Sequence, residues 1–215
     1  MFKQILSRWF GPPAKPASVP DDSGYFATQF ADRHEDTQLF VPWANRAPDL
    51  KARPYDNSLG VLSLVKLLSQ DQALGKLGAE QLSILGGYLD YVQLDNGKQV
   101  IGQDEQGDFL LIVLQGSVAE ERRLHNKSQV RIGEARPGDL LGEMSLFDGG
   151  GRFSSCVALS PVTLAVLSST ALERMMQEEP RLAGTVLAWI AKRLSLRLRQ
   201  VSARLSVQLT RTTAD

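Results

Sequence analysis

Residues Gly142–Leu159 (GEMSLFDGGGRFSSCVAL) combine side chains that suit an anion and a hydroxyl group. Their glycines let backbone N–H groups converge on an anion, and Arg152 adds a planar fork of donors that matches the paired oxygens of a phosphate. Glu143 can only accept hydrogen bonds at neutral pH, so its natural partner is a donor such as a sugar hydroxyl. The stretch therefore predicts a site for a ribose phosphate, with a plain glycine-rich turn as the alternative.

The elements around this stretch are expected to be short strands. From Tyr91 onward, apolar or alternating runs are separated by turn signals, and Asn96-Gly97 is a strong hairpin signal because both residues tolerate positive φ. Many short strands with glycine-marked turns predict an antiparallel jelly-roll β-barrel, or β-roll. The expected strands are YVQL, KQVI, FLLIVLQG, SVAEERRL, QVRIGEA, SCVALS and TLAVLS.

Flanking helices make the expected fold class α+β. Apolar residues recur at helical spacing between Leu59 and Leu85, again in Ser169–Glu179, and in a long run after Pro180. We divide the chain into four parts: an amphipathic N-terminal segment (1–10), a Pro-rich and largely irregular arm (11–55), a helical lead-in with the β-roll (56–180), and a long C-terminal helix with a tail (181–215).

The N-terminal segment places its large apolar residues on one face of a short helix. Such a segment either docks on a membrane surface or a partner groove, or packs on its own domain. The residues on this face are Phe2, Ile5, Leu6, Trp9 and Phe10.

A seven-residue repeat in the C-terminal helix predicts a homodimer. Apolar positions alternately four and three residues apart would build a seam for a second copy of the helix, although a stripe on the chain's own barrel is the alternative. The segment also has no acidic residue between Pro180 and Asp215, so it is either a candidate nucleic-acid binder or a solvated basic face. The seam residues are Leu187, Ala191, Leu194, Leu198, Val201 and Leu205.

Residues from about Leu74 to Leu198 resemble a cyclic-nucleotide-binding domain of the catabolite-activator and protein-kinase-regulatory-subunit family. The family's phosphate-binding cassette begins GE-x-x-L and continues with an arginine and a small-residue strand. This chain has Gly142-Glu143-Met144-Ser145-Leu146, then Arg152, then SSCVAL. Gly97, Gly107-Asp108, Gly116 and Pro137-Gly138-Asp139 precede the cassette at family-like spacing.

The resemblance implies an eight-stranded β-roll that binds cyclic AMP, with cyclic GMP and cyclic di-GMP as further candidates. Glu143 would accept a hydrogen bond from the ribose 2′-hydroxyl, and Arg152 would bind the cyclic phosphate. Gly142, Met144 and Ser145 would supply backbone and packing around the ribose. Ligand would then shift the packing of the long helix, so the module would signal through a separate effector protein.

Two features depart from the family pattern. Phe153 and Ser154, which follow the arginine, complete the expected ligand-binding residues, but Phe153 stands where the family usually has Ser, Ala or Thr. Either Ser154 takes that role in a shifted register or the roll is a ligand-free interaction scaffold. The family's bacterial transcription factors carry a helix-turn-helix domain after the long helix, and we expect none in this chain, which makes DNA an unlikely partner.

Composition favours a regulatory protein of the cytoplasm. The chain has 24 basic and 24 acidic residues, so no overall charge indicates nucleic acid or an anionic membrane. Its lone Cys156 and its two histidines, His34 and His125, form no metal-site spacing and no nucleophile–base pair, so we expect no metal, no cofactor and no enzymatic activity. No run approaches the length of a membrane span or a signal peptide.

Overall fold

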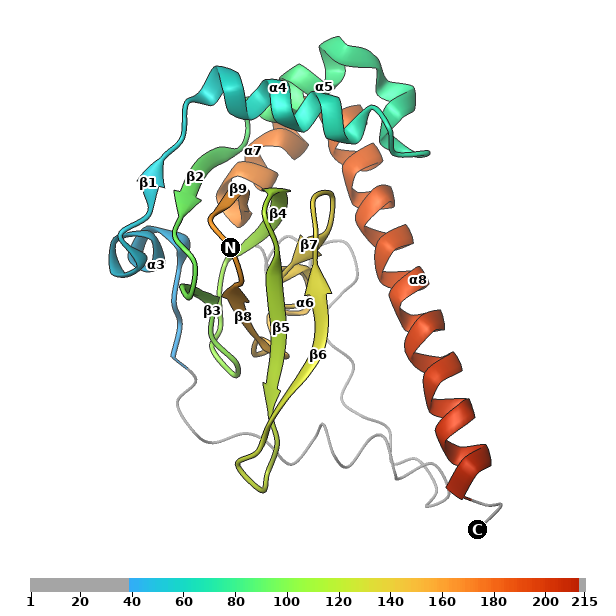
Figure 1. Ribbon diagram of the computed structural model, residues 1–215. Helices are drawn as coiled ribbons and strands as arrows, with labels where there is room; N and C mark the ends of the chain where they lie inside the picture. The colour runs from blue at the N-terminus through green and yellow to red at the C-terminus, as the bar shows by residue number, and fades with distance from the viewer. Residues whose placement is uncertain (1–38, 213–215) are drawn as a thin grey trace.

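A computed structural model describes residues 39–212 of the chain (Figure 1). The predicted amphipathic segment 1–10, the arm as far as residue 38, and the last three residues lie outside the described residues.

Two antiparallel sheets form a β-roll, as the sequence predicts. One sheet has the strand order β1-β2-β9-β4-β7, and the other has the order β3-β8-β5-β6. Every described pairing between strands is antiparallel. The strands are β1 (Arg53–Pro54), β2 (Asp90–Leu94), β3 (Gln99–Ile101), β4 (Phe109–Gln115), β5 (Val118–Arg123), β6 (Gln129–Ala135), β7 (Leu140–Leu141), β8 (Ser155–Ala158) and β9 (Val162–Ser168).

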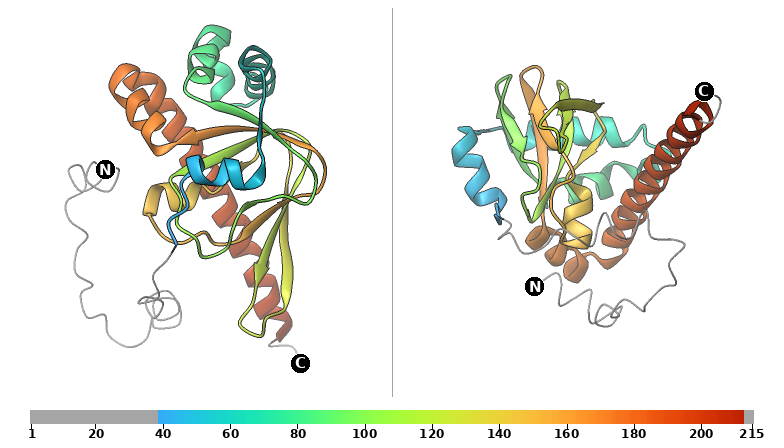
Figure 2. Two further views of the ribbon diagram at one scale, coloured as in Figure 1. Left: turned by 90° about the vertical axis from the view of Figure 1, so that its left-hand side faces the viewer. Right: turned by 90° about the horizontal axis from the view of Figure 1, so that it is seen from below.

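The helices gather at one end of the roll and along its side (Figures 1 and 2). The side chains of Asp56 and Ser168 cap α4 and α7 by accepting hydrogen bonds from the backbone N–H groups of Leu59 and Ala171. In both figures α3 and α8 lie on opposite sides of the roll. The helices are α3 (Trp43–Leu50), α4 (Asn57–Leu68), the 3₁₀ turn η1 (Leu74–Leu77), α5 (Gly78–Gly86), α6 (Glu143–Asp148), α7 (Ser169–Glu178) and α8 (Pro180–Thr212).

Strand β4 contributes to two hydrophobic cores, one inside the roll and one beneath the helices. Its residues alternate between two buried faces, which is why its sequence, FLLIVLQ, is almost continuously apolar. Phe109, Leu111 and Val113 pack inside the roll, whereas Leu110 and Ile112 pack beneath the helices.

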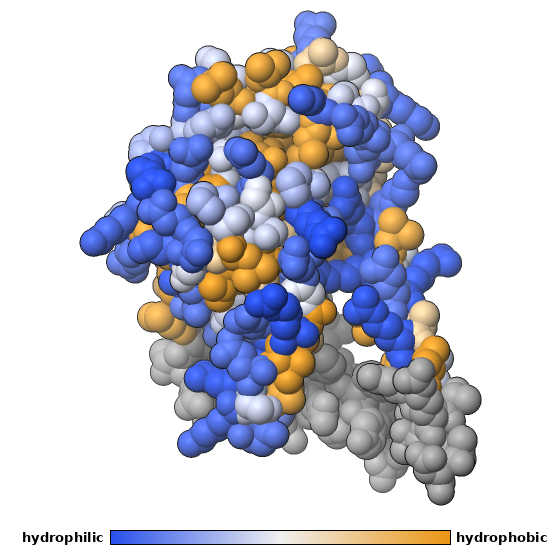
Figure 3. All heavy atoms as spheres, in the orientation of Figure 1, coloured by the Kyte–Doolittle hydropathy of each residue, from blue (hydrophilic) through white to orange (hydrophobic). Residues whose placement is uncertain are grey.

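Helix α8 changes character along its length. Its first turns are buried against the chain's own core through Leu182, Val186 and Trp189. The Trp189 Nε1–H group donates to Asp71 over 3.1 Å, and Arg193 forms an ion pair with Asp139, so this half is anchored by polar contacts as well. Residues 198–207 of the C-terminal half are exposed, and Figure 3 shows open space between this part of the helix and the β5–β6 hairpin.

The predicted seam residues divide between these two halves of α8. Leu187 and Leu194 pack partly on the chain's own core. The remaining seam residues, Ala191, Leu198, Val201 and Leu205, are exposed.

Three local features differ from the sequence-based expectation. Residues Trp43–Leu50, assigned to the irregular arm, form α3, because Trp43 and Leu50 pack on the roll although Pro48 lies inside the helix. The Asn96-Gly97 turn exists, with Gly97 at φ +77°, but β2 and β3 pair with β9 and β8 instead of with each other. The turn therefore connects two sheets and is not a hairpin.

The β5–β6 hairpin contains a bulge beside Glu120. The register shifts between Glu120, which pairs with Gly133, and Glu121, which pairs with Arg131, leaving Ile132 as the extra residue. Before the bulge β5 is buried in the roll; beyond it, residues 129–132 of β6 are all exposed.

Candidate functional site

The Gly142-Glu143 pair lies where β7 turns into the short helix α6. Gly142 has φ +78°, a left-handed conformation that favours glycine. Glu143 begins the helix with only 4% of its surface exposed, although it is charged. The sequence thus buries a carboxylate, which needs hydrogen-bond donors around it.

Arg152 is buried beside this turn with 2% of its surface exposed. Its Nη1 donates to the Gly142 carbonyl, and its Nη2 donates to the Phe109 carbonyl over 2.8 Å. A Cβ atom at Gly107 or Gly142 would collide with the guanidinium, so both glycines make room for it. Among residues 39–212, no carboxylate forms an ion pair with Arg152, so both of these hydrogen-bond acceptors are neutral.

Two aromatic side chains, Phe109 and Trp43, support Arg152. Its guanidinium lies 4.5 Å from the centroid of the Phe109 ring. Trp43 of α3 meets the same ring edge-on, with 5.1 Å between centroids, and its backbone N–H donates to Asp108 over 3.1 Å. Helix α3 therefore helps to position the arginine.

Arg197 of α8 reaches the site from the other side. It donates to Glu143 over 3.4 Å and forms a closer ion pair with Glu120 of β5. The Glu120 side chain is 11% exposed and the Arg197 side chain 41% exposed. A single guanidinium thus bridges two buried carboxylates and connects α8 to the roll.

The pKa values of the charged residues in the site shift in different directions. Burial lowers the pKa of Arg152 to about 10, so this arginine remains charged at neutral pH. Burial also raises the pKa of Glu143. For Arg197 burial acts in the lowering direction, but Glu120 and Glu143 outweigh it and raise the pKa.

The structure brings most of the predicted site residues together. Gly142, Glu143 and Arg152 are in direct contact or share partners, and Ser145 and Ser154 are buried close to them in sequence. Met144 is 45% exposed, on the outer side of α6.

Phe153 lies outside the buried site. Its ring is 45% exposed and stacks against Arg122, whose Cζ is 4.2 Å from the ring centroid. The ring therefore does not fill the space beside Arg152, whereas Ser154 is buried.

Sequence analysis missed Glu120, Arg197 and Phe109 as members of this site. Glu120 stood in a strand with polar neighbours, and Arg197 belonged to a basic run that resembles a solvated face. The signal that could have identified Glu120 is its alternation with buried Val118, which places it on the inward face of β5.

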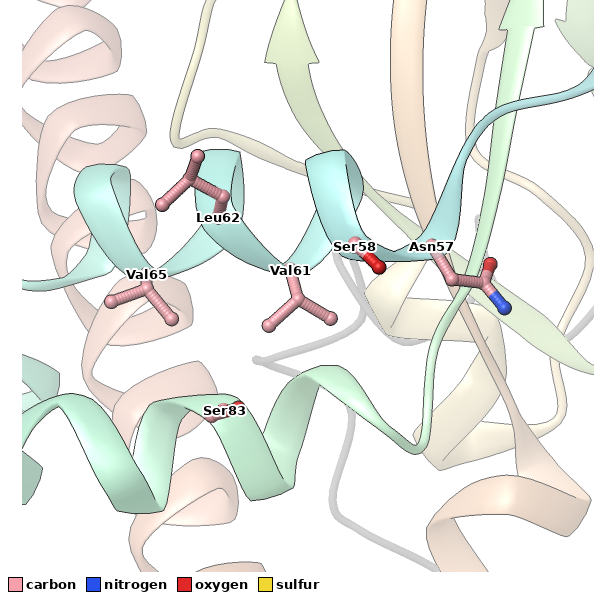
Figure 4. A pocket seen from close by; sticks show the side chains of 6 residues that line it. All are labelled: Asn57, Ser58, Val61, Leu62, Val65 and Ser83. Carbon is pink, nitrogen blue, oxygen red and sulfur yellow. The ribbon is translucent and has the colours of Figure 1, made fainter.

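The described part of the molecule also has a hollow of about 480 Å³ between α4 and α5, away from this site (Figure 4). In Figure 4, Val61 and Val65 point toward α5. No charged residue lines this hollow, which makes it a poor match for a phosphate. Its lining residues are Asn57, Ser58, Val61, Leu62, Val65 and Ser83.

Within residues 39–212, no group of three or more His, Cys, Asp or Glu side chains is placed to bind a metal ion. None of the helices in this range has the length and apolarity to cross a membrane. The arrangement of Arg152 and Glu143 instead suits an anion next to a hydroxyl donor.

Comparisons with known proteins agree with this chemistry. Residues 91–179 match the family model of the cyclic nucleotide-binding domain. A CRP-like cAMP-activated global transcriptional regulator from Mycobacterium tuberculosis is 28% identical over 130 residues, which are 58% of this chain and 58% of the relative. The matched part thus spans little more than half the length of that relative.

Solved structures extend the similarity to the fold. A cyclic nucleotide-binding domain from Methylobacillus flagellatus is 27% identical with a TM-score of 0.65, and the match covers 78% of this chain and 92% of that one. The Thermus thermophilus catabolite activator protein is 28% identical with a TM-score of 0.52, over 63% of this chain and 62% of that one.

Proposed function

Since residues 91–179 belong to the cyclic nucleotide-binding domain family, we propose that the protein is a regulatory sensor that binds a cyclic nucleotide and passes the signal to an effector protein through α8. Cyclic AMP is the first candidate because the Mycobacterium tuberculosis relative is cAMP-activated. Cyclic GMP and cyclic di-GMP are the further candidates. Arg152 would bind the cyclic phosphate, and Glu143 would accept from the ribose 2′-hydroxyl.

The observation that carries this proposal is the state of Arg152. Arg152 is a buried cation whose hydrogen bonds go to two neutral carbonyl groups, and burial lowers its pKa, so it carries a desolvation cost that an anion would offset. Glu143 is buried on the neighbouring turn, so an anion and a hydroxyl donor on one ligand would satisfy both groups. Phe153 is exposed and stacks on Arg122, so its ring is not packed on this pair.

Calorimetric titration of the full chain tests the proposal. Cyclic AMP, cyclic GMP and cyclic di-GMP are compared with 5′-AMP, which carries a base and ribose but no cyclic phosphate. A saturable heat with at least one cyclic nucleotide, and a weaker one with 5′-AMP, is the expected result. Absence of binding to all three cyclic nucleotides would contradict the sensor and leave the scaffold alternative, in which the roll serves only protein contacts.

The exposed half of α8 supports homodimerisation as part of this function. Leu198, Val201 and Leu205 present an apolar row at heptad spacing, and nothing in residues 39–212 covers it. Val130 and Ile132 on β6 are also exposed. A second copy of α8 would bury both groups.

Sedimentation of a Leu198→Glu/Val201→Glu variant tests the dimer. Both side chains are exposed in the single chain, so the substitutions leave its core intact. We expect a wild-type dimer and a variant monomer, with Leu62→Glu on α4, another exposed apolar position, as the matched control. A monomeric wild-type protein would refute the dimer.

Direct nucleic-acid binding by α8 remains the third hypothesis, supported by its basic residues. Salt-sensitive retention on DNA would favour it. Its most inward basic residues, Arg193 and Arg197, are already paired with acids in this chain, which weakens this hypothesis.

A further inference from the structure

Glu120 and Arg197 form a second polar pair in the site that the phosphate and ribose contacts do not use. Arg197 bridges Glu120 and Glu143, so Glu120 lies next to the ribose acceptor and on the α8 side of it. We infer that a ligand whose phosphate binds Arg152 and whose ribose binds Glu143 extends its base toward Glu120, and that Glu120 reads this base and favours guanine. The inference rests on the proposed binding of a cyclic nucleotide, and it ranks cyclic GMP above cyclic AMP, which the relative's name alone had placed first.

The partner that Glu120 holds indicates which base fits. The guanidinium of Arg197 donates to the Glu120 carboxylate. The N1–H and N2–H₂ groups of guanine, joined through C2, form the same guanidine-type edge and can donate two parallel hydrogen bonds to a carboxylate. Adenine has one amino group at N6 and acceptor nitrogens beside it, so it offers no such pair of donors.

The residues that flank Glu120 in the sheet are small. Its cross-strand neighbours are Gly133 on β6 and Cys156 on β8, both small. A Cβ at Gly133 would lie 3.2 Å from Glu120 Oε1, so any larger residue there would press on the carboxylate. Small residues on both sides of an inward carboxylate suit a flat aromatic base.

Guanine would displace Arg197 more completely than adenine. The ribose hydroxyl replaces Arg197 at Glu143, and the guanidine edge replaces it at Glu120, so α8 loses both of its contacts with the carboxylates. An adenine nucleotide replaces only the contact at Glu143, because a buried carboxylate without a donor is costly and Glu120 keeps its arginine. Base identity thus sets how far α8 is released.

Competition titrations with three cyclic nucleotides test this inference. Cyclic GMP carries both donors, cyclic IMP retains N1–H but lacks the 2-amino group, and cyclic AMP has neither. Wild type should bind cyclic GMP about 10-fold or more tightly than cyclic AMP, with cyclic IMP between them, because one bidentate contact discriminates by roughly that factor. Cyclic di-GMP carries the same edge and shows whether the ligand is a mononucleotide or a dinucleotide.

The variant Glu120→Gln should reduce the preference for cyclic GMP to within about 3-fold, since an amide replaces one acceptor with a donor. Glu121→Gln, on the next residue of the same strand, serves as the control and should keep the wild-type preference. The wild-type comparison of cyclic GMP with cyclic IMP needs no variant and is unaffected by folding defects.

Three outcomes are distinguishable. A preference for guanine that Glu120→Gln removes supports the inference. Equal or tighter binding of cyclic AMP, or a preference that survives Glu120→Gln, overturns it and leaves the sensor function intact. Failure to bind any cyclic nucleotide overturns both.

Discussion

Arg152 and Arg197 flank the same turn but are held in opposite ways. Arg152 is almost fully buried and is bound by neutral carbonyl groups, whereas Arg197 is partly exposed and is bound by two carboxylates. The first side chain therefore has no ionised hydrogen-bond acceptor, whereas two carboxylates compensate the charge of the second. In the proposed sensor, a ligand would add a partner at Arg152 and exchange partners at Arg197, so Arg152 would supply affinity and Arg197 would control α8.

The largest expected effect follows from removing the buried charge. Arg152→Gln should lower cyclic-nucleotide affinity by about 100-fold or more, in line with losing one partner of a desolvated charge pair. Calorimetry measures this loss. The variant Arg152→Lys keeps the positive charge without the planar guanidinium, so its affinity should lie between those of wild type and Arg152→Gln. Arg131→Gln, at an exposed arginine of β6, is the control. An unchanged affinity in Arg152→Gln would assign the phosphate elsewhere.

A double-mutant cycle on Arg197 and Glu120 measures the coupling free energy between these two side chains. Arg197→Met leaves two buried carboxylates without this partner, so it should cost more stability in the presence of Glu120 than in the Glu120→Gln background. We expect a coupling of about 1–2 kcal/mol in urea unfolding, reduced from buried-pair values because Arg197 is partly exposed.

The surface pair Arg131–Glu121 provides the matched cycle on the same hairpin. Its coupling should stay below about 0.5 kcal/mol. Equal couplings in the two cycles would mean that Arg197 contributes no more than a surface ion pair.

Glu143→Gln tests the electrostatics of the turn between the two arginines. Burial raises the pKa of Glu143, so the folded protein favours the protonated form of this side chain. The contribution of this protonation to folding stability is fully present below the usual pKa of 4.5 and is lost as the pH rises through the raised pKa. The variant should therefore have a slightly higher Tm than wild type at pH 7, and the difference should close near pH 4. Thermal scans across this range measure it, with the exposed Glu134→Gln as control; a variant that is less stable at pH 7 contradicts the sign.

The smallest effect is expected at Phe153. Because its ring stacks on Arg122 outside the buried site, Phe153→Ala should change ligand affinity by less than about twofold, as surface changes usually do. Binding assays on this variant decide the matter. A loss of tenfold or more would place the ring against the ligand.

The residues of the proposed phosphate and ribose contacts could be predicted from the sequence, and those of the proposed base contact could not. Gly142, Glu143 and Arg152 stand in one ordered stretch, so their residue types and spacing indicate their chemistry together. Glu120 and Arg197 lie on a strand and a helix 77 residues apart, and only the packing of α8 on the roll brings them into contact. The charge of each, taken alone, is typical of a solvated surface.

The fold shows the same division between local and long-range information. Strands β4 and β9 were visible as apolar runs, because burial on both faces leaves a continuous signal. Strand β7 has only two residues, too few for a periodic pattern. Helix α3 has apolar residues at helical spacing, Trp43, Ala47 and Leu50, but it contains Pro48, which usually breaks a helix. The strands before and after the Asn96-Gly97 turn, β2 and β3, pair in different sheets. No local sequence pattern specifies which sheet a strand joins.

The bulge at Glu120 and Glu121 also separates two parts of the β5–β6 hairpin that should differ in their rates of amide hydrogen exchange. Amides of Val118–Glu120 lie in the buried wall of the roll and should exchange with solvent deuterium only when the roll opens. Amides of Gln129–Ile132 lie beyond the bulge on an exposed strand and should exchange by local fraying, orders of magnitude faster. The residue that we assign to base reading thus marks the boundary between a slow and a fast region, and slower exchange beyond it would report the arrival of a second chain.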